Sequence, residues 1–222
     1  MTHPTIENRL LWLASLCLLL YPLSSQGNAQ SVEQALKKIV ESFEMSDTTL
    51  PLALQRLAAK YHLLVGLEIL PDFDGAAKKT ITVKVHTKTV RELLDALVKA
   101  DSRYLWTTVN QSVDVFPATG TDPLLQVRLP RFRAEGVDRN EAVDVLLNSP
   151  EIQPELTRAL LRRREVMSLP ADAPRVLPRF SLDVSYVTVR EILNQIVAAS
   201  HSSFWSFVRY GQQRQFFSVK VR

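Results

Sequence analysis

The chain has 222 residues, of which 46% are hydrophobic and 23% charged, a composition that excludes a disordered, collagen-like or coiled-coil chain. One Cys excludes a disulfide scaffold and a cysteine-based zinc site, and six widely spaced Gly exclude the Gly-x-Ser-x-Gly elbow of many hydrolases. The net charge of +4 favours an anionic partner: a nucleic acid, an anionic membrane or an acidic protein.

The N-terminus has the pattern of a secretory signal. Arg9 precedes the apolar run Leu10–Leu20, which is too short to span a membrane, and a small-x-small triplet ends at Ala29. We expect cleavage between Ala29 and Gln30, with an uncleaved membrane anchor as the open alternative. Cleavage removes the single Cys17, so the predicted mature chain is exported, has no transmembrane segment and depends on packing for its stability.

The next part of the chain, residues 30–116, predicts one small domain. Its helices and strands follow from apolar periodicity, and Thr89 and Glu92 have the spacing of a capping box at a helix start. In chain order we expect a helix at 31–40, a strand at 43–45, a helix at 50–61, strands at 63–70 and 81–85, a helix from Thr89, and strands at 104–109 and 113–115.

A polar segment with Pro and Gly, residues 117–124, predicts a linker to a second domain at 125–222. We expect a strand at 125–132, a helix capped by Asp138 and Glu141, a helix near 154–164, a Pro-rich connector at 168–178, a strand at 180–184, a helix from Thr188, and strands at 203–208 and 217–222.

The two halves contain an internal repeat. Thr89–Val109 aligns without gaps to Thr188–Val208, and nine of the 21 positions are identical, including a Thr-Val-Arg-Glu start and one Trp in each copy. Each copy predicts a strand, a helix and a strand. The chain is therefore expected to be an α+β protein with two small two-layer sandwiches of β-α-β-β-α-β type, each with its helices on one face of its sheet.

Residues 43–116 resemble the short N-terminal (STN) domain of secretins and TonB-dependent receptors. The resemblance is carried by the order of elements and by the apolar helix positions Leu50, Ala53, Leu54, Leu57 and Ala58, then Val90, Leu93, Leu94 and Leu97. The second half looks like a diverged relative. No secretin core or barrel sequence follows within these residues, so we expect neither a pore nor a receptor. The resemblance implies a periplasmic module that makes protein–protein contacts in transport, secretion or signalling assemblies.

No residue pattern predicts catalysis, a cofactor or a metal. His62, His86 and His201 are far apart in the sequence and lack the spacing of metal ligands, and Asp72–Gly75 lacks most of a calcium loop. Equivalent Trp106 and Trp205 predict equivalent packing rather than ligand stacking. We therefore expect a protein without enzymatic activity.

The positive charge is concentrated in the second half as arginine. Residues 117–222 hold eleven acids and fifteen bases, and fourteen of these bases are Arg. Guanidinium groups suit carboxylate and phosphate, so two clusters are candidate docking residues for an acidic envelope protein, with a solvated face as the alternative. They are Arg128, Arg131 and Arg133, and Arg158, Arg162, Arg163 and Arg164. Nucleic acid is disfavoured because export removes it and no KH-type loop is present.

These patterns together predict a non-catalytic, exported interaction module of the cell envelope, periplasmic and peripheral to the outer membrane. The alternatives are a periplasmic enzyme or small-ligand-binding protein with a site between the halves, and an oligomer-forming envelope component.

Overall fold

The computed structural model describes residues 31–72, 79–159, 162–163, 177–210 and 216–222 of the chain. The predicted signal segment and its cleavage site between Ala29 and Gln30 lie outside these residues. In the described part of the chain, no helix is both long enough and apolar enough to cross a membrane.

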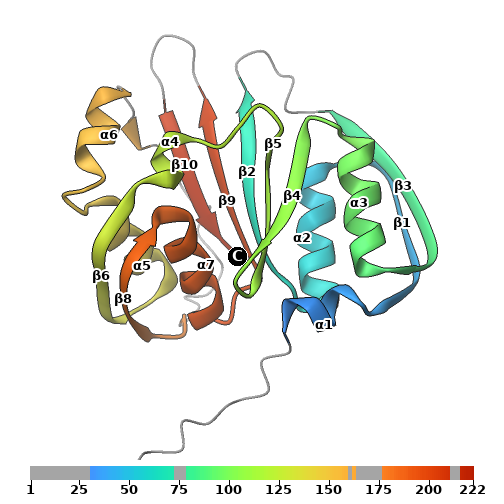
Figure 1. Cartoon of the computed structure of the whole chain (residues 1–222), viewed down its shortest axis with the longest axis horizontal. Helices are drawn as coiled ribbons and strands as arrows, with labels where there is room; N and C mark the ends of the chain where they lie inside the picture. Colours follow the sequence, from blue (N-terminus) through green and yellow to red (C-terminus); the bar gives the residue numbers. More distant parts are fainter. Residues whose placement is uncertain (1–30, 73–78, 160–161, 164–176, 211–215) are drawn as a thin grey trace, which may run out of the picture. The chain divides into compact units, whose positions relative to one another are not determined.

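The described residues form an α+β fold, which confirms the predicted class (Figure 1). The helices are α1 (Val32–Leu36), α2 (Leu50–Tyr61), α3 (Val90–Ala100), α4 (Pro123–Gln126), α5 (Arg139–Leu147), α6 (Gln153–Arg158) and α7 (Val189–Ala199). The strands are β1 (Ile39–Thr49), β2 (Leu64–Asp72), β3 (Thr80–Thr89), β4 (Tyr104–Val109), β5 (Ser112–Pro117), β6 (Arg128–Val137), β7 (Arg162–Arg163), β8 (Phe180–Thr188), β9 (Phe204–Tyr210) and β10 (Phe216–Val221).

Three helices begin at the capping boxes that the sequence predicts. Thr89, Asp138 and Thr188 each accept a hydrogen bond from the backbone three residues on, and the Glu at that position bonds back to the capping residue. These reciprocal bonds satisfy amide groups that the first helical turn leaves without partners.

Some predicted boundaries are wrong because tertiary pairing overrides local periodicity. The helix expected at 31–40 ends at Leu36, since β1 begins at Ile39 and pairs with β3. The strand expected from 125 begins at Arg128, because Asp122 caps the short helix α4. The helix expected at 154–164 stops at Arg158, and residues 162–163 pair with β10.

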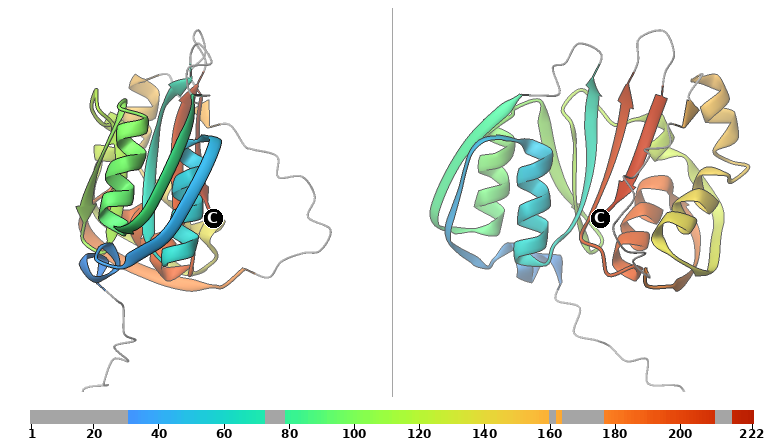
Figure 2. Two further views of the ribbon diagram at one scale, coloured as in Figure 1. Left: turned by 90° about the vertical axis from the view of Figure 1, so that its right-hand side faces the viewer. Right: turned by 180° about the vertical axis from the view of Figure 1, so that it is seen from behind.

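The strands form one six-stranded sheet, in the order β4-β5-β2-β9-β10-β7, and two small antiparallel sheets, β1-β3 and β6-β8. In the first half α2 and α3, and in the second half α5 and α7, lie between a small sheet and the six-stranded sheet (Figures 1 and 2). The predicted two-layer sandwich therefore has a third layer, since β1 and β3 also turn a row of buried apolar side chains toward the helices.

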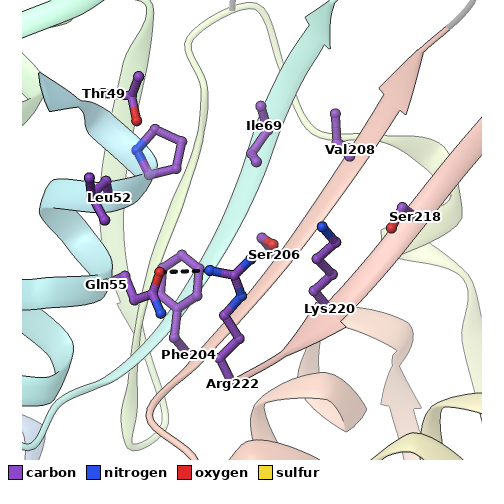
Figure 3. Close-up of a pocket in the computed structure, with 11 residues that line it drawn as sticks. Thr49, Leu52, Gln55, Ile69, Phe204, Ser206, Val208, Ser218, Lys220 and Arg222 are labelled. Atoms are coloured by element: carbon purple, nitrogen blue, oxygen red, sulfur yellow. Dashed lines mark hydrogen bonds between the residues drawn. The ribbon is translucent and has the colours of Figure 1, made fainter. Parts of the chain in front are cut away.

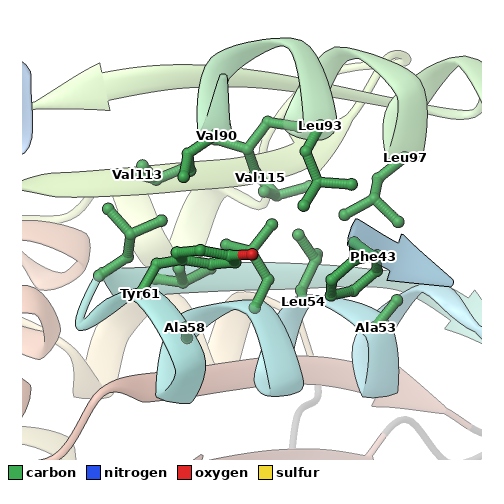
Figure 4. Packing of buried hydrophobic residues seen from close by; sticks show 14 of the residues in the cluster. Phe43, Ala53, Leu54, Ala58, Tyr61, Val90, Leu93, Leu97, Val113 and Val115 are labelled. Carbon is green, nitrogen blue, oxygen red and sulfur yellow. The ribbon is translucent and has the colours of Figure 1, made fainter. Parts of the chain in front are cut away.

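Two hydrophobic clusters lie on opposite faces of the six-stranded sheet. The first lies between α2, α3 and the small sheet β1-β3, and includes Val65 of β2 and Val115 of β5 (Figure 4). The second includes Trp205 and Phe207 of β9, and Leu64 from the other face of β2 packs against it. Because side chains alternate along a strand, the helices of the two halves cover opposite faces of one sheet.

The two halves join edge to edge within this sheet. β2 from the first half pairs in parallel with β9 from the second half, with Gly66 opposite Trp205. Residues 117–124 therefore connect two parts of a single compact unit that extends from Ser31 to Arg222.

Candidate functional site

The junction between the halves is the place where one copy of the repeat docks on the other half of the chain. Trp205 of β9 is fully buried and lies beside Gly66 of β2. A Cβ atom at Gly66 would lie 2.5 Å from the Trp205 ring, well inside van der Waals contact. Gly at position 66 therefore lets the indole ring approach the backbone of the other half closely.

A buried ion pair crosses this junction. Arg190 of α7 donates to Glu68 of β2 at 2.5 Å, and both side chains are less than a tenth exposed. The backbone amide of Asp122 donates to the second Glu68 oxygen at 2.5 Å, and Asp122 pairs with Arg209. Burial raises the pKa of Glu68, and the charge of Arg190 opposes that rise.

A second buried carboxylate lies next to the first. The Asn194 side-chain amide of α7 donates to Asp114 of β5 at 3.1 Å and accepts from the Trp205 indole N–H at 2.6 Å. Burial raises the pKa of Asp114, while the charge of Arg190 opposes the rise. Glu68 and Asp114 both accept hydrogen bonds from α7 side chains inside the protein. They therefore serve to hold α7 on the strands of the first half.

The first copy of the repeat carries a similar set of groups, with Asp95 in the place of Asn194 and with Arg91 and Asp95 exposed. Arg91 lies over the Trp106 ring at 5.4 Å, as Arg190 lies over Trp205 at 5.8 Å. The Trp106 indole N–H donates to Asp95 at 2.8 Å, as Trp205 donates to Asn194. The predicted equivalence of the two Trp residues is thus seen in their contacts, although the surroundings of the two copies differ.

We call Arg91, Asp95, Leu105 and Trp106 the head surface. It lies on α3 and on β4, which is an outer strand of the six-stranded sheet in the described part of the chain. Arg91 and Asp95 are exposed, and Leu105 is 49% exposed, whereas Arg190 and Asn194 at the junction are buried. The exposed Arg91 side chain donates to both carboxylate oxygens of Glu33 in α1. This surface therefore offers charged, aromatic and apolar side chains for docking, and among the described residues no further strand pairs with β4 beyond β5.

A groove of about 270 Å³ lies beside α2 on the face of the sheet that the helices of the second half leave uncovered (Figure 3). Its lining residues are Thr49, Pro51, Leu52, Gln55, Ile69, Phe204, Ser206, Val208, Ser218, Lys220 and Arg222. Arg222 donates to Gln55 at 2.9 Å. The Ser218 hydroxyl is buried and has no hydrogen-bond partner among the described residues. The groove thus combines an apolar wall with hydroxyl and cationic groups.

A second hollow, of about 390 Å³, lies between β3 and α3 next to the head surface. It is lined by Lys84, Val85, His86, Lys88, Glu92, Asp95, Ala96 and Lys99. Lys88 pairs with Glu92 at 3.1 Å, and Lys84 pairs with Glu44. Its charged walls are in part neutralised by local pairs.

The predicted arginine clusters lie away from the junction. Arg128 donates to the Tyr186 carbonyl at 2.7 Å, and Arg131 bonds to Asp183 on the neighbouring strand β8. Arg133 pairs with Glu135. The first cluster therefore lies along β6 with two of its three guanidinium groups paired to carboxylates.

The second predicted cluster is divided between two elements. Arg158 at the end of α6 donates to Glu155 at 2.5 Å. Arg162 and Arg163 form β7, whose backbone pairs with β10, and Arg164 lies outside the described residues. The charge pattern alone did not identify Glu68, Arg190, Asp114 or Asn194. The repeat contained the signal, since it aligns Arg91 with Arg190 and Trp106 with Trp205.

Within the residues that the structure describes, no group of three or more His, Cys, Asp or Glu side chains is placed to hold a metal ion. No protein-family model matches the chain, and neither does a curated protein or a solved structure.

Proposed function

We propose that the chain is a non-catalytic, exported protein–protein interaction module of the cell envelope, similar in role to the periplasmic short domain of secretins and TonB-dependent receptors. One observation carries this proposal. The α7–β9 surface, with Arg190, Asn194 and Trp205, docks on the first half of the chain, and within the described residues no element covers the outer edge of its repeat counterpart on α3 and β4.

Exposed strand edges are a general route to protein recognition, because their backbone groups can pair with a further strand. The head surface adds an apolar side chain, Leu105, and a Trp–Arg pair, which are residue types enriched in binding hot spots. These features support docking through α3 and β4 rather than through the arginines of β6.

A photo-crosslinking amino acid at Leu105 tests the proposal in the native envelope. We expect covalent adducts to envelope proteins from this position. The matched control is Tyr186, an exposed residue on β8 away from the head surface. If Leu105 gives no more adducts than Tyr186, docking through the head surface is refuted.

A second candidate function, a binder of small amphiphilic carboxylates, is favoured by the groove between the halves. Lys220 and the buried Ser218 hydroxyl lie at one side of it, and Phe204 and Leu52 offer apolar contacts. Octanoate is the probe. It should raise the unfolding temperature of the wild type but not of Lys220→Gln, and equal shifts in both would refute a carboxylate site there.

A further inference from the structure

We infer that the head surface binds an extended segment of another protein, which pairs in parallel with β4 and has the pattern apolar-Gly-apolar-acid-apolar. This inference rests on the proposed function, because it names the chemical class of partner that the head surface takes. Its basis is the junction inside the chain, where β2, with the residues Val65-Gly-Leu-Glu-Ile69, occupies the equivalent edge of β9.

The outer edge of β4 corresponds to the edge of β9 that β2 occupies. β4 and β9 align in the repeat, and each pairs antiparallel with the strand that follows it, β5 or β10. On the other edge of β9, the Ser203 carbonyl accepts from the Val65 amide at 2.9 Å, and the repeat counterpart of Ser203 is Tyr104. Because the Arg103 carbonyl accepts from Ala118 on the β5 side, and carbonyls alternate along a strand, the Tyr104 carbonyl faces the outer edge.

The Trp106 ring requires a small residue opposite it in the added strand. At the junction, Gly66 is opposite Trp205, and a Cβ atom on Gly66 would lie 2.5 Å from the ring. Trp106 is held as Trp205 is, since an arginine lies over each ring and each indole N–H donates to a side chain eleven residues earlier. A strand that passes Trp106 as β2 passes Trp205 therefore needs Gly at this position.

Arg91 favours an acid two residues after that Gly. Glu68 of β2 lies two residues after Gly66, so it is on the same face of the strand, and it accepts from Arg190 at 2.5 Å. Arg91 aligns with Arg190 and lies at a similar distance from its own Trp ring, 5.4 Å against 5.8 Å. Its partner in the structure, Glu33, is 53% exposed. Because exposed ion pairs are weak, an incoming carboxylate can replace Glu33 on Arg91.

The apolar residues of the pattern would lie on the face of the added strand that is next to Leu105. At the junction, Phe204 is the counterpart of Leu105; it is opposite Val65 and only 3% exposed. Leu105 is 49% exposed, so an apolar residue just before the Gly would remove apolar surface from water. The other two apolar positions correspond to Leu67 and Ile69, which lie on the same face of β2 as Val65.

The added strand is expected from a different protein rather than from a second folded copy of this chain. Within the described residues, β2 carries the required pattern, and both of its edges are occupied, one by β5 and the other by β9. A second copy could offer β2 only by opening its own junction. An extended segment of another protein needs no such opening, and addition of such a segment to a sheet edge is a common mode of peptide recognition.

The test measures, by fluorescence anisotropy, the binding of a fluorescein-labelled peptide with the sequence of residues 64–70 to the full chain. Replacing the Gly of the peptide with Val should weaken binding at least about tenfold, because the added side chain would meet the Trp106 ring. In Trp106→Ala, the Gly and Val peptides should bind equally well. A peptide of reversed sequence has the same composition but the acid before the Gly, and it should bind at least about tenfold more weakly than the original.

A charge exchange tests the acid position. Replacing the Glu of the peptide with Lys should weaken binding to the wild type about tenfold, and Arg91→Glu should restore binding of the Lys peptide. Arg128→Glu changes an exposed arginine on β6 and is the matched control, which should bind each peptide as the wild type does. Circular dichroism shows whether each variant is folded.

The inference is overturned if the original peptide does not bind, or if the folded wild type binds the Gly and Val peptides equally. A preference for Gly that persists in Trp106→Ala would also overturn it. The Leu105 crosslinking experiment separates the two proposals, since adducts to another envelope protein, together with a peptide that does not bind, would retain the proposed function and refute the added strand. Adducts to a second copy of this chain would likewise refute the added strand. Neither adducts nor peptide binding would refute both proposals.

Discussion

Replacing Gly66 with Ala tests whether the two halves are joined through the Trp205 contact. The added methyl group would lie 2.5 Å from two ring carbons of Trp205 and 2.7 Å from its nitrogen. The ring is fully buried and its nitrogen donates to Asn194, so it has little room to move. Overpacking of this kind costs about 1–3 kcal/mol, and loss of the hydrogen bond adds about 1 kcal/mol.

The expected loss for Gly66→Ala is therefore about 2–4 kcal/mol, or roughly 5–15 °C in unfolding temperature for a unit of this size. The direction of the change in stability distinguishes the two cases, because a Gly→Ala substitution without a clash stabilises the folded protein by about 0.5–1 kcal/mol through its effect on the unfolded state. Urea denaturation followed by circular dichroism measures the change, and a constant slope shows that the transition is still cooperative.

The Trp205→Phe background is the control for this prediction, because the smaller ring leaves room for the methyl group. A double-mutant cycle should show that the cost of Gly66→Ala shrinks in that background. If Gly66→Ala is neutral or stabilising in the wild type, or costs the same in both backgrounds, the close contact at the junction is refuted.

Three further predictions concern the buried charges and the N-terminus. Arg190→Ala leaves Glu68 buried without its cation and should cost about 3–5 kcal/mol in urea denaturation, whereas the exposed counterpart Arg91→Ala should cost less than about 1 kcal/mol; equal losses would contradict the assignment. Because burial raises the folded-state pKa of Asp114, its contribution to stability is fully present below the unfolded pKa of about 4 and is lost as pH rises through the folded value. Asp114→Asn should therefore gain unfolding temperature over the wild type as pH rises from about 4 to 8, and a flat difference would refute the shift. Mass spectrometry of the protein from the envelope should find Gln30 at its N-terminus, and a chain that retains residues before Gln30 would contradict cleavage after Ala29.

The elements that could be predicted from the sequence are those determined by local interactions. The helices α3, α5 and α7 begin at Thr89, Asp138 and Thr188, because each capping box lies within four consecutive residues. The α+β class follows from the same local periodicities, since alternating and helical patterns are each readable within a short window.

The elements that could not be predicted depend on partners far away in the sequence. Nothing local indicates that β2 pairs with β9, because both strands carry large apolar side chains on each face and would suit several neighbours. The end of α1 at Leu36 is a further case, since pairing with β3 draws residues from Ile39 onward into a strand. The intrinsic helix or strand propensity of a residue is too small to outweigh such long-range strand pairing.

The candidate site was partly visible in the repeat, and its chemistry became clear only from the packing. Arg91 and Arg190 are identical in the alignment, yet one is exposed beside Glu33 and the other is buried against Glu68. A sequence comparison shows that both positions hold Arg, but only the sheet order shows that one of them lies at an occupied interface.

The ion pairs in the structure also change how the positive charge of the second half is interpreted. The second half contains fourteen Arg residues, yet those along β6 and on α6 pair largely with carboxylates of their own half, such as Asp183 and Glu155. Exposed pairs of this kind keep a carboxylate beside each guanidinium, which lowers the net positive charge that this surface presents to an outside partner. Complementarity to a partner therefore depends less on the total positive charge than on single cations such as Lys220, for which the described residues provide no ion-pair partner.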